Sequence, residues 1–139
     1  MDLPDVNVLL ALTLREHVHH ESAQGWLETV QTFATTPVTE AGLVRLSMNR
    51  AVTGAAASID LSLAALRSMR AHPRAVFLPD DTSLAEPLVD LTGLVGHRQV
   101  TDLHLLNLAA RHGARLVTFD TRLASTLQPA DRDHVLTLR

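Results

Sequence analysis

Four carboxylates lie where the sequence predicts that a strand ends or a helix begins: Asp5, Glu40, Asp102 and Asp120. Asp5 closes the first strand candidate, and Asp120 directly follows the run RLVTF, which is the most convincing strand. Glu40 and Asp102 fall in the first turns of predicted helices. Because the carboxyl ends of parallel strands share one edge of a sheet, these acids can converge although they are far apart in the chain.

Carboxylates that converge in this way repel one another, which raises their pKa values unless a cation lies among them. Mg²⁺ and Mn²⁺ are hard ions that take oxygen ligands, so either ion would reconcile four acids in one place. The four acids therefore predict a divalent metal site.

Each acid also has a purely structural interpretation. A carboxylate in a first helical turn gains roughly 0.3 to 1 kcal/mol from the helix dipole, which would account for Glu40 and Asp102 without any site. Asp120 could cap the helix that follows it, and Asn7 could do the same after Asp5. The joint placement of the acids at equivalent junctions favours the functional interpretation.

The residue types that are missing narrow the chemistry further. The chain has no cysteine, which removes disulfides, thiolate zinc sites and a thiol nucleophile. All 12 residues counted as Lys or Arg are arginine, so no lysine can form a Schiff base or complete a phosphate-binding P-loop. Carboxylates that act without a lysine usually imply a metal.

Composition bounds the fold and the partners. A chain of 139 residues, 46% hydrophobic and 19% charged, is expected to form one globular domain over residues 1–139. The formal net charge of -3 argues against a protein that coats nucleic acid by bulk charge, but it leaves room for a local arginine patch. Each apolar run falls far short of the ~20 residues that span a bilayer, and the start MDLPD lacks the basic segment of a signal peptide. The predicted location is the cytoplasm, with no membrane association.

Short strands alternate with helices along the chain. Strands are expected at residues 2–6, 32–36, 75–81, 115–119 and 134–138. Helices are expected at residues 19–30, 37–50, 58–72, 83–94, 102–112 and 122–127. This alternation is typical of an α/β fold, in which a short parallel β-sheet is flanked by helices on both faces.

The helix at 102–112 has the clearest boundaries. Thr101 is expected to cap its start, and Gly113 is a natural cap at its end. Helical spacing predicts which of its apolar residues face the core: Leu103, Leu106, Ala109 and Ala110.

Histidines offer an alternative set of ligands. His17, His20 and Glu21 lie at helical spacings that can bind a transition metal. No second cluster of ligands accompanies them, which favours an ordinary exposed helix start.

Polar residues also occur before and within the helix at 102–112 and at 79–81. His97 and Arg98 precede the helix at 102–112 and can touch a phosphate, whereas His104 is expected to point away from Asp102. The sequence PDD at 79–81 is typical of a turn.

Four blocks of the sequence together resemble one protein family. LPDVNVLLAL, TEAGLVRL, VTDLHLLNLAARHGARLVTFD and TRLAS, in this order and spacing, are similar to the PIN-domain ribonuclease toxins of the VapC type, from bacterial type II toxin–antitoxin pairs. The similarity covers essentially the whole chain. One departure from the family pattern is a very short first strand, with Asp2 and Pro4 before Asp5.

The resemblance places the family's acidic quartet on the four acids found by position: Asp5, Glu40, Asp102 and Asp120. It implies that Asp5 and Asp102 hold the main ion, that Asp120 completes its shell, and that Glu40 orients or deprotonates the nucleophile. Beside these acids, the residues that match supporting positions or could contact the RNA backbone are Asn7, Thr118 and Arg98.

The function implied is that of a Mg²⁺- or Mn²⁺-dependent endoribonuclease that hydrolyses RNA phosphodiesters with metal-activated water. The family also implies a homodimer and a partner antitoxin whose tail masks the active site. One rival is aspartyl-phosphate chemistry, which needs a lysine that this chain lacks. The other is a catalytically inert PIN-like module that only binds RNA or protein, and the intact quartet counts against it.

Overall fold

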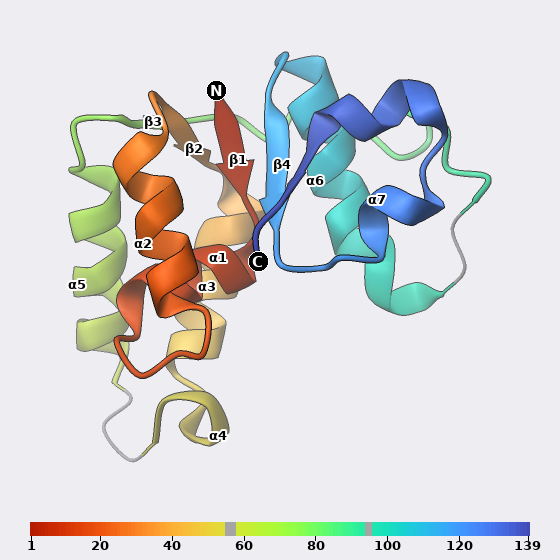
Figure 1. The fold of residues 1–139 in the computed structure, drawn as a ribbon. Coiled ribbons are helices and arrows are strands. Elements are labelled where there is room, and N and C mark those ends of the chain that lie inside the picture. Colours follow the sequence, from red (N-terminus) through yellow and green to blue (C-terminus); the bar gives the residue numbers. More distant parts are fainter. Residues whose placement is uncertain (55–57, 94–95) are drawn as a thin grey trace.

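The computed structural model describes residues 1–54, 58–93 and 96–139. Within them, five strands form one sheet in the order β3-β2-β1-β4-β5, and every neighbouring pair is parallel (Figure 1). The strands are β1 (Asp2–Pro4), β2 (Phe33–Thr35), β3 (Ala75–Phe77), β4 (Arg115–Thr118) and β5 (Val135–Thr137). The parallel sheet predicted from the alternation of elements is confirmed, and β1 lies at its centre.

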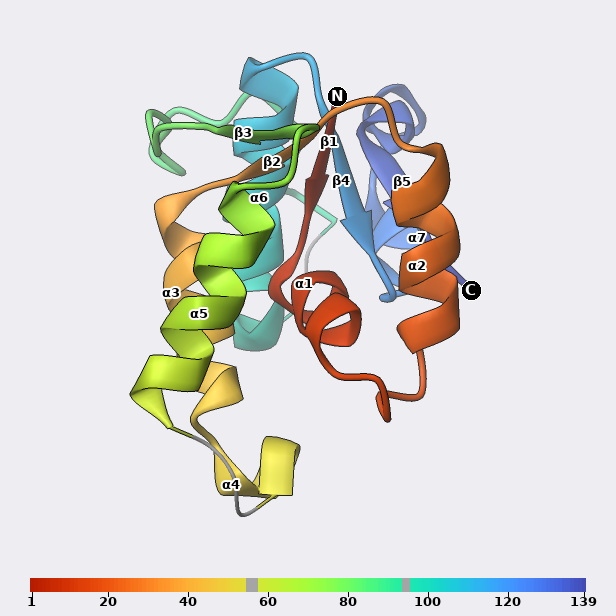
Figure 2. The ribbon, with the colours of Figure 1, turned by 90° about the vertical axis from the view of Figure 1, so that its left-hand side faces the viewer.

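Helices cover both faces of this sheet. The longer ones are α1 (Val6–Thr13), α2 (His20–Thr29), α3 (Pro37–Ser47), α5 (Ile59–Arg70) and α6 (Val100–Arg111). Short ones are α4 (Arg50–Thr53), α7 (Leu123–Thr126) and the 3₁₀ turns η2 (His97–Gln99) and η3 (Pro129–His134). Figure 2 shows α1 between α2 on one side and the pair α3 and α5 on the other. None of the described helices combines the length and the apolar character needed to cross a membrane.

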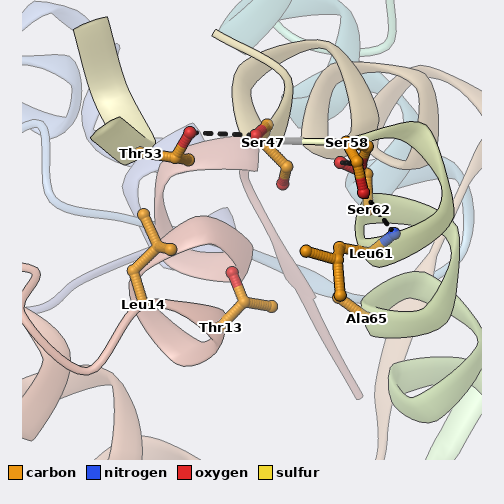
Figure 3. A pocket seen from close by; sticks show the side chains of 8 residues that line it. All are labelled: Thr13, Leu14, Ser47, Thr53, Ser58, Leu61, Ser62 and Ala65. Carbon is orange, nitrogen blue, oxygen red and sulfur yellow. Dashed lines mark hydrogen bonds between the residues drawn. The ribbon is translucent and has the colours of Figure 1, made fainter. Parts of the chain in front are cut away.

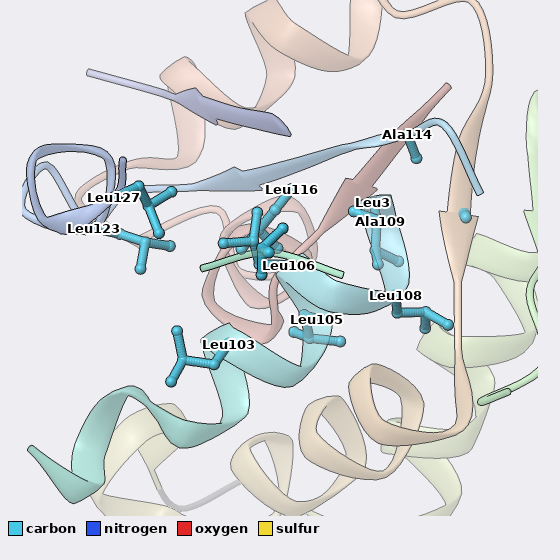
Figure 4. Close-up of a cluster of buried hydrophobic side chains, with 12 residues drawn as sticks. Leu3, Leu103, Leu105, Leu106, Leu108, Ala109, Ala114, Leu116, Leu123 and Leu127 are labelled. Carbon is cyan, nitrogen blue, oxygen red and sulfur yellow. The ribbon is translucent and has the colours of Figure 1, made fainter. Parts of the chain in front are cut away.

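Alternate residues of the strands face two different cores, as the pleat of a strand requires. On one face, Leu3 and Leu116 pack with the leucines of α6 (Figure 4). On the other face, Phe33 and Val117 pack with Trp26 of α2. The sheet is therefore buried on both sides, and only its edges and the ends of its strands reach solvent.

Helix α6 buries residues outside the single apolar face that helical spacing predicts. Besides Leu103, Leu106 and Ala109, both Leu105 and Leu108 are fully buried, whereas Ala110 is only partly so. The reason is that apolar residues of the stretch before it, including Val89, pack onto the same cluster. The sequence-based stripe was therefore too narrow.

The ends of α6 were predicted with mixed success. Gly113 adopts a φ of 60° just beyond the last turn, a left-handed conformation that glycine adopts without strain, so the predicted end is confirmed. The helix begins earlier than expected, because Gln99 and not Thr101 holds the cap position and η2 leads directly into Val100.

The helix predicted at 83–94 is wrong: residues 83–93 contain no helix, and residue 94 lies outside the described residues. Pro87 interrupts the segment, and buried Asn107 of α6 takes over its hydrogen bonding. The Asn107 Oδ1 atom accepts from the Leu88 amide at 2.7 Å, and its Nδ2 donates to the Ser83 carbonyl at 3.3 Å. These bonds give two backbone groups of the stretch a partner without a helix.

The turn predicted for 79–81 is also wrong. These residues have no turn structure, and both aspartates bond to histidines of the α6 segment. His104 Nε2 lies 2.6 Å from Asp80 Oδ1, and His112 Nε2 lies 2.9 Å from Asp81 Oδ1. His104 thus points away from Asp102, as expected, and ties the preceding stretch to α6.

A glycine allows α3 to approach the start of α1. A Cβ atom added at Gly42 would lie 2.5 Å from Val6 Cγ2, closer than carbon atoms can pack. Val6 directly follows Asp5 and Gly42 lies two residues after Glu40. This close contact therefore sets the position of two predicted site residues relative to each other.

At the opposite end of β1, buried Asp2 joins three elements. Its carboxylate accepts hydrogen bonds from Trp26 Nε1 at 3.0 Å and from Arg115 Nε and Nη2 at 3.0 and 3.1 Å. The paired geometry with the guanidinium is the stronger, bidentate kind. Asp2 therefore links β1 to α2 and to β4.

We predict that Asp2→Ala lowers the free energy of unfolding by about 2 to 3 kcal/mol, because the Trp26 N–H and the Arg115 guanidinium lose their shared partner. Urea unfolding followed by the fluorescence of Trp26, the only tryptophan, measures the change. The matched control is Glu16→Ala, at an exposed position, which should change stability by less than about 0.5 kcal/mol. Equal stability of the two variants would contradict a structural role for Asp2.

Candidate active site

Asp5 leaves the centre of the sheet and caps the next helix. Its backbone amide donates to the Val117 carbonyl of β4 at 2.8 Å, and its Oδ1 accepts from the Val8 amide at 2.8 Å. The side chain is therefore the N-cap of α1, the position for which Asn7 was considered. Capping and function are not alternatives here, because Asp5 caps the helix at the edge where the other acids gather.

Thr118, the last residue of β4, connects Asp5 to Asp120. Its hydroxyl accepts from the Asp120 amide at 3.0 Å and lies close enough to the Asp5 carboxylate to lower the pKa of that group. Asp120 Oδ1 in turn accepts from the Arg122 amide at 2.8 Å, but the cap position of α7 is held by Arg122, so the interpretation of Asp120 as the cap of that helix is wrong. A single hydroxyl thus sets the spacing between two acids on neighbouring strands.

Asp102 completes a cluster of three acids. It lies in the first turn of α6, and its pKa is raised to about 6, first by burial and then by the negative charges of Asp5 and Asp120. Both effects disfavour the ionised form. No described cationic side chain forms an ion pair with any of the three acids.

The pKa of Asp5 is raised as well, mainly by burial, with a smaller contribution from the charge of Asp120. Hydrogen bonds from Thr118 and from the backbone amides of Val8 and Asn7 oppose this rise. Asn7 therefore contributes through its backbone amide, while its side chain is exposed. Burial outweighs the hydrogen bonds, which leaves Asp5 and Asp102 both favouring a neighbouring positive charge.

Glu40 has different surroundings. Its Oε1 accepts from Thr35 Oγ1 at 2.7 Å and lies 3.6 Å from Arg70 Nη1. It is not among the charges that raise the pKa of Asp102. The structure thus groups three of the four acids and holds the fourth at the end of β2 in an ion pair.

Sequence reasoning missed Thr35 and Arg70. A signal for Thr35 was present, because it ends β2 as Thr118 ends β4, and both hydroxyls bond an acid. Arg70 had no such signal. It comes from the last turn of α5, and its guanidinium also lies 4.5 Å from the centre of the Phe77 ring.

The cluster fits a hard cation by its chemistry. It offers only carboxylate oxygens, two of its acids are desolvated, and their like charges are uncompensated. As they stand, the described side chains include no group of three His, Asp or Glu already arranged around one ion. Asp5 and Asp120 each accept a backbone amide with Oδ1, and each carboxylate has a second oxygen that can bind an ion.

The histidine alternative gains no support from the described residues. His20 Nδ1 lies 2.7 Å from the Ala11 carbonyl, and His17 Nδ1 accepts from the His19 amide at 3.2 Å. His97 is exposed in η2, where Arg98 also lies, but the Arg98 side chain is outside the described residues.

A separate hollow of about 250 Å³ lies between the end of α1 and α3, α4 and α5 (Figure 3). Its walls carry hydroxyl and aliphatic groups and no charge: Thr13, Leu14, Ser47, Thr53, Ser58, Leu61, Ser62 and Ala65. It therefore lacks the groups that hydrolysis requires, and the acids remain the candidate site.

Comparison with known proteins agrees with the geometry. The family model of the PIN domain matches residues 3–126. Ribonuclease VapC39 of Mycobacterium tuberculosis is 46% identical over 127 residues, which cover 89% of this chain and 91% of the relative. Ribonuclease VapC38 of the same species is 45% identical over 130 residues, which cover 92% of this chain and 91% of the relative. For Ribonuclease VapC29, also from this species, the identity is 44% over 123 residues, with 88% and 87% covered. The chain that carries these acids at the carboxyl edge of a parallel sheet belongs to the PIN-domain family, among relatives of the VapC ribonucleases.

Proposed function

We infer that the protein is an endoribonuclease that acts as the toxin of a type II toxin–antitoxin pair. The observation that carries this function is the cluster of Asp5, Asp102 and Asp120, in which burial and neighbouring negative charge raise the pKa values of Asp5 and Asp102 and no described cationic side chain forms an ion pair. The names of the relatives, which are ribonucleases, support RNA as the substrate. A catalytically inert PIN-like module is the alternative, and the raised pKa of Asp102 argues against it, because an inert module gains nothing from that destabilising arrangement.

We assign the site residues as follows. Asp5 and Asp102 would hold a divalent ion, and Asp120 would bind it directly or through water. When bound, the ion lowers the pKa of water and stabilises negative charge on the phosphate. Glu40, held by Thr35 and Arg70, orients the attacking water or takes its proton. Thr118 keeps Asp5 and Asp120 at a fixed spacing, and the backbone amide of Asn7 supports Asp5.

VapC nucleases of the PIN-domain family require a metal, and we propose Mg²⁺ or Mn²⁺ here because the cluster offers oxygen atoms alone. RNA and an antitoxin are the partners that membership of this group implies. A homodimer, a cytoplasmic location and a contact of Arg98 with the RNA backbone are further parts of the proposal.

We predict that Asp102→Asn keeps the fold and lowers ribonuclease activity at least 100-fold, because the amide preserves the shape and removes a metal-binding charge. Circular dichroism and cleavage of RNA in Mg²⁺ measure the two properties. The matched control is Asp60→Asn, which changes the same residue type in the first turn of α5 and should retain activity. Parental activity in a folded Asp102→Asn protein would remove Asp102 from the site.

The raised pKa of Asp102 predicts an unusual pH dependence of stability in EDTA. Between the ordinary value of 3.8 and about 6, the folded state binds more protons than the unfolded chain, so this group makes the protein less stable as pH rises through that window. In EDTA, the melting temperature should therefore fall less between pH 4 and pH 7 for Asp102→Asn than for the parent.

Adding Mg²⁺ at pH 7 should raise the melting temperature of the parent more than that of Asp102→Asn. Superimposable pH profiles would show that Asp102 is not destabilised by its neighbours.

The chemical groups at the ends of the cleaved RNA distinguish two nucleophiles. Attack by water with departure of the 3′-oxygen leaves a 5′-phosphate and a 3′-hydroxyl, whereas attack by the RNA's own 2′-hydroxyl expels the 5′-oxygen and leaves a 2′,3′-cyclic phosphate and a 5′-hydroxyl. The acids favour water as the nucleophile, and His20, His104 and His112 each already have a bonding partner. We expect 5′-phosphate ends by mass spectrometry, no cleavage in EDTA, and recovery with Mg²⁺ or Mn²⁺. Cyclic phosphate ends formed in EDTA would contradict the metal mechanism.

A further inference from the structure

A cavity of about 380 Å³ opens between the residues after β4, α7, η3 and the end of β5. Five of its six lining residues are arginines or carry hydroxyls: Thr121, Ala124, Ser125, Arg132, Thr137 and Arg139. None of these side chains is a carboxylate. This lining is the reverse of the acid cluster, because it offers positive charge and hydrogen-bond donors.

The two arginines are available to an external anion. In contrast to Arg70, Arg111 and Arg115, neither Arg132 nor Arg139 forms an ion pair with a described carboxylate. Arg132 Nε donates to the Leu127 carbonyl at 3.2 Å, which orients the guanidinium and leaves its other N–H groups for a ligand. Arg132 and Arg139 are both exposed.

The cavity and the acids lie along the same edge of the sheet. Thr121 directly follows Asp120, and Thr137 pairs in register with Thr118 across the β4–β5 ladder. Neighbouring strands lie about 4.8 Å apart, and Thr118 is the residue that joins Asp5 to Asp120. The cavity thus begins one strand away from the acids.

We propose that this cavity binds a backbone phosphate of the RNA next to the one that is cleaved, with Arg132 and Arg139 as its cationic ligands. The proposal rests on the proposed ribonuclease function and adds a substrate subsite to it. A chain with a net charge of -3 and an acidic reaction centre repels RNA, so local positive groups must hold the strand there. Guanidinium and hydroxyl groups are common partners of phosphate oxygens and read no base sequence.

The test measures RNA affinity and cleavage for Arg132→Gln/Arg139→Gln. The matched control is Arg67→Gln, which removes one exposed arginine from α5. Binding of a fluorescent single-stranded RNA oligonucleotide in EDTA is followed at several salt concentrations, and kcat and KM are measured in Mg²⁺. Losing one phosphate contact should reduce the slope of log affinity against log salt by about 0.7. We expect KM to rise about tenfold, as for the loss of a charged hydrogen bond, while kcat stays within about twofold and Arg67→Gln behaves as the parent.

Because Arg132 also bonds the Leu127 carbonyl, Arg139→Gln alone provides a second variant that leaves this bond in place. It should show the same direction of change with a smaller size. Parental salt slope and KM in Arg139→Gln and in the folded double variant would overturn the subsite while leaving the ribonuclease function standing. A parent protein that neither cleaves nor binds RNA would overturn the proposed function, and the subsite with it.

Discussion

The burial of Asp5 and Asp102 beside a third acid, Asp120, is the constraint to which the rest of the molecule is adapted. Burial of like charges at one sheet edge is destabilising, as the raised pKa values of Asp5 and Asp102 record. Several features reduce that destabilisation without cancelling the charge. Asp5 and Asp102 lie at the N-terminal ends of α1 and α6, where the helix dipole favours an anion. The hydroxyl of Thr118 and nearby amides supply hydrogen bonds, and no described cation forms an ion pair with the cluster.

The opposite end of the sheet is organised to hold this arrangement. Asp2, at the other end of β1, is paired with Arg115 and Trp26, so the acid that begins this short strand stabilises the fold, whereas Asp5, which follows the strand, lies in the acid cluster. Two separate apolar cores fix the sheet between α6 and the helices α1, α2 and α5. Gly42 lets α3 pack directly on α1, which brings the Glu40 region to the Asp5 region. Packed helices and strands thus hold the acids at both ends of β1 in place.

Much of this could be predicted from the sequence, because parallel topology alone places the ends of β1 and β4 and the start of α6 at one edge. What could not be predicted depends on tertiary partners. Asn107 replaces a helix in the 83–93 stretch by bonding its backbone, and His104 and His112 hold Asp80 and Asp81 out of a turn. Arg70 reaches Glu40 from a helix that carries no sequence signal for that contact. Sequence patterns over a few residues indicate only contacts between residues that are close in the chain. The residues in each of these contacts are 19 to 31 positions apart.

The central claim is that Asp5, Asp102 and Asp120 together form one site for a divalent ion. The most direct measurement is an anomalous difference map from a crystal of the protein soaked in Mn²⁺. We expect a peak between the carboxylates of Asp5 and Asp102, within reach of the Asp120 carboxylate. A Mn²⁺ peak only at His17 and His20, or no peak near the three acids at saturating Mn²⁺ and neutral pH, would contradict it.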